Sequence, residues 1–181
     1  MFIEVARVVL QIAKSQFDIR YNPFQIMSKV SVSANDRTTL KVKVIEARGV
    51  RAADSHLIGS DSSDPYVKVF IRKQDRGNYH KTNVIKKTLN PVWGESFVLY
   101  PSNEQLICDA LHFEVYDKDK GSADDLLGIV KLSIAHFANP DNNDRDEWYT
   151  IWDKDTSKDS VTGRKPGKGQ LRLRIKLTIK D

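Results

Sequence analysis

Residues 171–179 read LRLRIKLTI, and apolar and polar side chains alternate along this stretch without interruption. Successive side chains of a β-strand point to opposite faces of a sheet, so a period of two predicts a strand with one buried face and one wet face. The stretch 40–44 repeats the pattern, with Lys41 and Lys43 between apolar residues. The stretches 40–44 and 171–179 are therefore both predicted to be β-strands.

The same reasoning predicts strands along the whole region between these two stretches. Alternation and β-branched or aromatic residues indicate further strands near 67–71, 79–85, 95–100, 111–115, 126–133 and 147–152. Turn-forming pairs such as Asn90-Pro91 and Asn139-Pro140 separate them. Eight short strands without alternating helices predict an all-β fold, an eight-stranded antiparallel β-sandwich.

Two segments differ from this pattern. Residues 2–17 favour an amphipathic helix, so we expect an N-terminal extension over 1–37 and one folded domain over 38–181. That helix would pack on the sandwich, bind a protein partner or lie in a membrane interface, where its polar face is only weakly basic. Residues 153–169 are polar and basic, which predicts a long exposed loop.

Composition limits the classes of protein that the chain can represent. The chain has 181 residues, with 29 Lys and Arg against 24 Asp and Glu, and this mild excess does not predict a nucleic-acid partner. Cys108 is the single cysteine, which excludes an intrachain disulfide and indicates a reducing compartment. No apolar run approaches the roughly 18 residues of a membrane span. We therefore expect a cytoplasmic protein.

Aspartates cluster at two junctions between predicted strands and loops. Asp54 and Asp64 form the first cluster, and Asp117, Asp119 and Asp125 form the second. Massed carboxylates are unfavourable unless a hard cation neutralises them, and Ca²⁺ prefers six to eight oxygen ligands. An aspartate in a loop is more often part of a turn, which is the alternative for each residue taken singly. The spacing nevertheless suits a calcium site at one end of the sandwich.

Three motifs resemble the C2 domain family, which includes modules of synaptotagmins and protein kinase C. They are 63–69 (SDPYVKV), 88–97 (TLNPVWGESF) and 117–128 (DKDKGSADDLLG), and the resemblance covers about residues 38–180. Gly169 precedes the last alternating stretch rather than the first, which resembles the circularly permuted topology of the family. The resemblance implies a sandwich whose loops bind calcium and whose surface binds membranes.

The resemblance also implies the metal ligands. The side-chain ligands would be Asp54, Asp64, Asp117, Asp119, Asp125 and the Ser122 hydroxyl, with main-chain carbonyls from Ala53 and Lys118. The loop between Asp54 and Asp64 is longer than is usual in the family and contains Asp61. Asp61 is therefore the alternative first-loop ligand, although the residues before Asp54 match the motif better.

Other positions are candidates for contact with lipid. Apolar residues in the enlarged first loop and lysines on the sandwich face are the candidates, namely Leu57, Ile58, Lys68, Lys81 and Lys86. In relatives that bind phosphoinositides, lysines are usual at the positions of Phe70 and Asn83 as well as at those of Lys68 and Lys81. This chain therefore has only half of that lysine patch. Packing within the loop and solvation of the strand face are the corresponding structural explanations.

The resemblance favours calcium-dependent binding to anionic phospholipid, with phosphatidylserine as the expected headgroup and phosphoinositides as the alternative. Such a module would bring a signalling or vesicle-trafficking protein to membranes as a peripheral protein. One alternative is a calcium-insensitive domain that binds proteins through a sandwich face or through residues 2–17. Another is the targeting portion of a larger lipid-modifying enzyme or vesicle-priming factor. The sequence contains no catalytic motif, so the chain itself is not expected to be an enzyme.

Overall fold

A computed structural model of the chain describes residues 37–52, 62–72, 75, 77–138, 142–153 and 166–180. The elements, in chain order, are β1 (Arg37–Arg48), β2 (Pro65–Phe70), β3 (His80–Lys81), β4 (Val92–Leu99), α3 (Asn103–Cys108), β5 (Ala110–Asp117), β6 (Asp125–Ser133), the 3-10 helix η2 (Ile134–Ala138), β7 (Asp144–Trp152) and β8 (Pro166–Lys180). The prediction of an all-β, eight-stranded antiparallel sandwich is confirmed.

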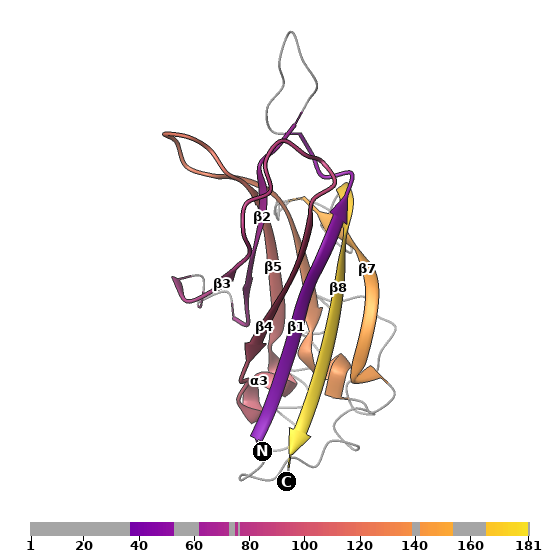
Figure 1. Ribbon diagram of the computed structural model, residues 1–181. Coiled ribbons are helices and arrows are strands. Elements are labelled where there is room, and N and C mark those ends of the chain that lie inside the picture. The colour runs from indigo at the N-terminus through magenta and orange to yellow at the C-terminus, as the bar shows by residue number, and fades with distance from the viewer. Residues whose placement is uncertain are drawn as a thin grey trace.

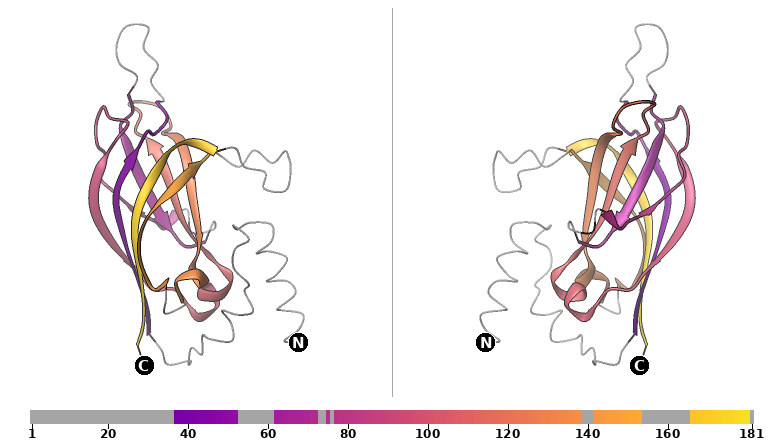
Figure 2. Two further views of the ribbon diagram at one scale, coloured as in Figure 1. Left: turned by 90° about the vertical axis from the view of Figure 1, so that its right-hand side faces the viewer. Right: turned by 90° about the vertical axis from the view of Figure 1, so that its left-hand side faces the viewer.

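The strands follow the order β3-β2-β5-β6-β7-β8-β1-β4, and each neighbouring pair is antiparallel. The half β4-β1-β8-β7 faces the half β3-β2-β5-β6 across the core (Figures 1 and 2). The pair Ile129–Trp152 joins β6 to β7, where one half turns into the other. The last strand lies beside the first, as the permuted topology implies.

The alternation in the sequence determines which side chains form the core. On β1, Leu40, Val42 and Val44 are fully buried, and their partners on β8 point to the same inner face. Lys41 and Lys43 are exposed on the outer face of the same strand. Each half of the sandwich thus has one buried face, and the two apolar faces pack together as expected for a sandwich.

The predictions for two segments differ most from the structure. The predicted strand 79–85 is regular only in β3, although the amides of Thr82 and Ile85 still donate hydrogen bonds to the β2 carbonyls of Val67 (3.0 Å) and Pro65 (3.1 Å). β8 begins at Pro166, so part of the predicted loop 153–169 is strand. A proline is acceptable at the first position of a strand, where its missing amide costs no ladder hydrogen bond.

The short helix α3 was not predicted from the sequence. Ser102 caps it by accepting a hydrogen bond from the Gln105 amide, and the Gln105 side chain accepts one from the Ser102 amide. This Ser-x-x-Gln capping box was the available indication, but six residues are too few for a helical period to be recognised. Within the described residues, no helix is long and apolar enough to cross a bilayer.

Several predictions concern segments outside the described residues. They are the amphipathic helix 2–17, most of the loop after β7 and the first-loop residues 53–61. The division into an extension over 1–37 and a domain over 38–181 remains a prediction.

Candidate metal centre

Three predicted ligands occupy neighbouring strand ends. Asp64 immediately precedes β2, Asp117 ends β5 and Asp125 begins β6. In the sheet, Pro65 pairs with Asp117 and Asp117 pairs with Asp125, so the three aspartates lie at one end of the sandwich, the upper end in Figure 1. The end formed by Asp64, Asp117, Asp119 and Asp125 is called the carboxylate end below.

Asp117 is the most deeply placed of these residues. It is 1% exposed, and its Oδ1 accepts a hydrogen bond of 2.5 Å from the Asp64 amide. The Lys118 amide in turn donates to the Asp64 carbonyl over 3.0 Å. Burial of a carboxylate is costly unless hydrogen bonds or a cation compensate the lost hydration. These reciprocal contacts fix the start of β2 against the end of β5.

The Asp64 carboxylate is held from a third segment. Its Oδ1 accepts a hydrogen bond of 2.8 Å from the amide of Lys87, which has a positive φ of 52°. The next amide, from Thr88, donates to the Ser63 carbonyl over 2.9 Å. The segment before β4 therefore orients Asp64.

The base of the first loop is fixed in the same region. The Ser63 hydroxyl donates to the Arg51 carbonyl over 3.1 Å, and the Arg51 guanidinium donates to the Leu126 carbonyl over 3.1 Å. These contacts bring the residues on either side of the first loop next to the start of β6. Of the predicted site residues, Ala53, Asp54, Leu57, Ile58 and Asp61 lie in the part of this loop outside the described residues.

The loop between β5 and β6 carries the remaining predicted ligands. Asp119 is partly exposed, whereas Ser122 and Asp125 are exposed. Their oxygens therefore face solvent at the carboxylate end, although the structure does not bring them into contact with one another.

Asp124 is a residue of this end that the sequence analysis missed. Its carboxylate accepts hydrogen bonds from the Tyr66 hydroxyl (2.7 Å), the Lys118 amine (2.8 Å) and the Asp119 amide (3.2 Å). Partial burial opposes the charge of Asp124, but these donors outweigh it and lower its pKa to about 2. Burial and the contact with Asp124 raise the pKa of Tyr66. Asp124 therefore holds the loop in its folded conformation and anchors the Lys118 amine.

The donor chemistry of this end fits calcium. The side-chain donors are carboxylates and one hydroxyl, which are hard oxygen ligands of the kind that Ca²⁺ prefers. The chemistry of the donor set therefore fits the ion. Within the described ranges, no three His, Cys, Asp or Glu side chains already form a group that would hold an ion.

The two predicted lipid-binding strand lysines lie on the same half of the sandwich as these strand ends, on β2 and β3. Lys68 on β2 pairs with Lys81 on β3, and both amines lie over tyrosine rings. The Lys68 amine is 4.3 Å from the Tyr116 ring centre, and the Lys81 amine is 3.9 Å from that of Tyr66. Lys86 is exposed in the segment that leads to the carboxylate end. These contacts hold the two strand lysines against aromatic faces.

Comparison with known proteins identifies relatives of the chain. Residues 38–151 match the C2 domain family. Human synaptotagmin-9 is 41% identical over 102 residues, which are 56% of this chain and 19% of that protein. Synaptotagmin-10 of Pongo abelii is also 41% identical, over 62% of this chain and 20% of that protein. The chain thus spans about a fifth of the length of the synaptotagmins that it matches.

Solved structures agree with this match. A C2 domain of plant extended synaptotagmin 1 is 25% identical with a TM-score of 0.57, over 79% of this chain and 95% of that one. A calcium-bound pair of C2 domains from extended synaptotagmin 2 is 26% identical with a TM-score of 0.57, over 77% of this chain and 45% of that one. Human cytosolic phospholipase A2 shares the fold, at 24% identity and a TM-score of 0.56, over 80% of this chain and 17% of that one.

Proposed function

Because this chain belongs to the C2 domain family, we propose that it binds anionic phospholipid membranes in response to calcium. The observation that carries the proposal is the placement of three aspartates at neighbouring strand ends, where the Asp64 amide donates a hydrogen bond to the buried Asp117. Such a module would act as a peripheral membrane protein of the cytoplasm.

The carboxylate end would hold the ion through its four aspartates. The Ser122 hydroxyl and the Lys118 carbonyl would add ligands, and the first loop would contribute Ala53 with Asp54 or Asp61. When bound, calcium supplies positive charge that offsets the repulsion between these carboxylates and an anionic bilayer. The hydrogen bonds of Asp124 with Tyr66 and with the Asp119 amide would keep the β5–β6 loop, which carries Asp119 and Ser122, in one conformation.

Lysines would add to membrane attraction. Each basic group close to an anionic leaflet contributes about 1 kcal/mol. Lys86 precedes Lys87, whose amide donates to the Asp64 carboxylate at the carboxylate end. Lys68 and Lys81 form a second basic surface, which suits phosphoinositide headgroups, while phosphatidylserine is the expected partner of the carboxylate end. Leu57 and Ile58 in the first loop are the proposed apolar contacts with the bilayer.

Family membership points to a non-enzymatic module. The fold shared with the phospholipase means that C2-like sandwiches also occur within enzymes. Attachment to a signalling, vesicle-trafficking or catalytic protein is therefore part of the proposal. A calcium-insensitive protein-binding domain, with residues 2–17 as one contact, is the alternative.

Co-sedimentation with phosphatidylserine vesicles, in calcium and in EGTA, tests the proposal. We expect the chain to pellet in calcium only, and the variant Asp117→Asn/Asp119→Asn to stay in the supernatant. The control Glu104→Gln/Glu147→Gln removes two exposed carboxylates outside the carboxylate end and should pellet like the wild type. Equal pelleting of the wild type with and without calcium would contradict the proposal, as would no pelleting at all.

A further inference from the structure

The outer face of β1 and β8 carries like charges directly opposite one another. Lys41 pairs with Lys176, and Lys43 pairs with Arg174. All four side chains are exposed, because the residues between them on each strand point into the core. Like charges at paired positions of adjacent strands destabilise a sheet. The four residues are called the β1–β8 basic patch.

Carboxylates compensate this patch incompletely. The Asp144 carboxylate contacts both Arg174 (3.0 Å) and Lys176 (3.3 Å), so one anion serves two cations. Among the described residues, neither Lys41 nor Lys43 takes part in an ion pair. The patch therefore has a surplus of positive charge on its β1 side.

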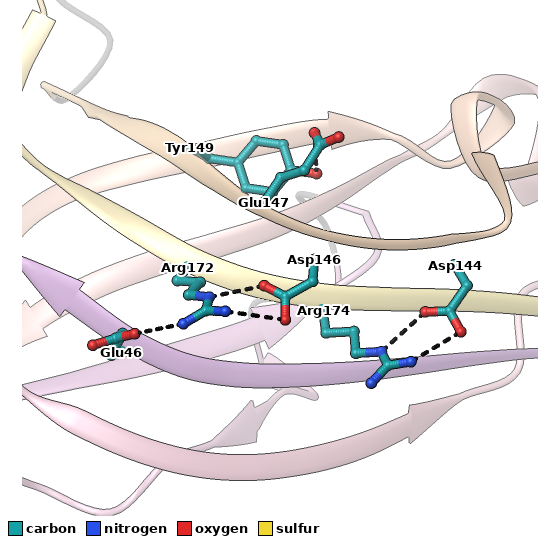
Figure 3. Close-up of polar contacts among 7 residues, drawn as sticks. All are labelled: Glu46, Asp144, Asp146, Glu147, Tyr149, Arg172 and Arg174. Carbon is teal, nitrogen blue, oxygen red and sulfur yellow. Dashed lines mark hydrogen bonds and ion pairs between the residues drawn. The ribbon is translucent and has the colours of Figure 1, made fainter.

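The neighbouring arginine differs from the patch. Arg172 on β8 lies between Asp146 (2.8 Å) and Glu46 (3.0 Å), and Figure 3 shows this pairing next to that of Arg174 with Asp144. Two carboxylates thus flank one cation at Arg172, whereas cations are in excess one register step further along β1. The imbalance belongs to specific positions and is not a general property of the face.

Protection of a sheet edge does not explain the patch. Lysines commonly prevent unwanted pairing at edge strands. Here β1 is flanked by β8 and β4, and β8 by β7 and β1, so both strands are interior. The edges are β3 and β4. Two like-charged pairs on interior strands favour an anionic ligand that neutralises them.

The position of the patch favours a protein as this ligand. Arg48 ends β1 next to the first loop, and Lys43 lies about 17 Å from it along the strand. A bilayer at the carboxylate end, which rests on the proposed function, would lie beyond the Debye length of about 8 Å at physiological salt. Apolar surface borders the patch instead: Val98 pairs with Lys41 and is 38% exposed, and the following Tyr100 is 75% exposed. Exposed aromatic residues such as Tyr100, and arginines such as Arg174, are enriched at protein interfaces.

We propose that the β1–β8 basic patch docks an acidic segment of a partner protein in extended conformation. Residues two apart along a strand lie about 7 Å apart and face the same way. Acidic residues at every second position of an extended segment would therefore match the spacing of Lys41 and Lys43. The surface is separate from the carboxylate end, so docking does not require calcium.

A labelled ten-residue peptide of alternating glutamate and threonine is the probe, measured by fluorescence anisotropy with the full chain in EGTA at low salt. We expect Lys41→Gln/Lys43→Gln to weaken binding at least fivefold. Lys87→Gln/Lys120→Gln removes the same charge from exposed positions outside the patch and should change binding less than twofold. Asp144→Asn should tighten binding, because it removes the one carboxylate that serves the patch. A peptide with its glutamates in one block should bind more weakly.

Three results would overturn the proposal: equal weakening by both lysine pairs, equal binding of the two peptides, or no binding of either peptide. Sedimentation with phosphatidylserine vesicles in EGTA tests lipid as the alternative ligand. If the wild type bound these vesicles but not the peptide, and Lys41→Gln/Lys43→Gln lost the vesicle binding, the patch would be a lipid site. The variant Lys41→Gln/Lys43→Gln removes like-charged pairs, so its melting temperature should not fall below that of the wild type. A lower melting temperature would indicate a folding defect. If the chain bound the peptide but did not sediment with vesicles in calcium, the proposed calcium-dependent function would fail and the docking proposal would stand.

Discussion

At the scale of single residues, Asp124 and Asp125 are adjacent in the chain but have different environments. Asp125 begins β6 with its side chain exposed, whereas Asp124 turns back to accept hydrogen bonds from Tyr66 and Lys118. An ion competes poorly for a carboxylate whose oxygens are already occupied by three donors. We therefore propose Asp125 as the ligand and Asp124 as the residue that shapes the loop.

Gly128 permits the close approach of β6 to β7. A Cβ atom at this position would lie 2.4 Å from Ile151 Cγ2 and 2.7 Å from the Trp152 carbonyl oxygen. A backbone oxygen cannot move aside as a flexible side chain can. We expect Gly128→Ala to destabilise the fold by about 1–3 kcal/mol, as overpacking does, and denaturant unfolding would measure this change.

The matched control for this variant is Gly77→Ala. A Cβ atom at Gly77 meets none of the described atoms within 4 Å, so the free energy of unfolding should change by less than about 0.5 kcal/mol. Equal effects of the two substitutions would show that the contact between β6 and β7 is not the cause.

At the scale of the elements, the β7–β8 pair is held by cross-strand ion pairs. Hydrogen bonding from Arg174 holds the pKa of Asp144 below its usual value, and Lys176 adds to the effect against partial desolvation. The folded state therefore favours ionised Asp144. Its contribution to stability is full above the unfolded pKa of about 3.8 and is lost as the pH falls through the lower folded pKa.

We therefore expect Asp144→Asn to melt about 1–3 °C below the wild type at pH 7, as is typical of an exposed ion pair. The difference should shrink as the pH falls below about 3.8, because the wild-type carboxyl then becomes protonated as well. Melting curves of both proteins across this pH range measure it. A difference that persists unchanged at pH 2 would mean that packing, rather than charge, is responsible.

At the scale of the whole molecule, calcium binding should be coupled to stability. A ligand that binds only the folded state stabilises it by about 2.7 kcal/mol at a concentration 100 times its Kd. For a domain of this size we expect a rise in melting temperature of roughly 5–10 °C at such a concentration. Magnesium should have a smaller effect, because it demands a tighter octahedral site.

Differential scanning calorimetry in calcium, magnesium and EGTA measures this coupling. The variant Asp117→Asn/Asp119→Asn should melt at the same temperature in all three conditions. A wild-type melting temperature that does not respond to calcium would favour the calcium-insensitive alternative.

The sequence alone determined the fold class, because the period of two is a local property that each strand displays by itself. The stretch 171–179 is the clearest case: its apolar residues up to Leu177 are buried as predicted, and Ile179 is partly buried. Local patterns did not predict the bounds of short or irregular elements, as in α3 and β3. The clustering of aspartates where strands meet loops was also visible in the local sequence, and the resemblance to the family gave the set of ligands. Calcium binding by them stays a prediction.

Only the tertiary structure decided which of these residues meet. The Asp64 amide reaches the buried Asp117 because β2 and β5 are neighbours, although their residues lie far apart in the chain. The opposition of Lys41 and Lys176 likewise depends on the register between the first and last strands. Register is a long-range property, since it is set by the packing of both apolar faces at once, and one strand's sequence does not contain it.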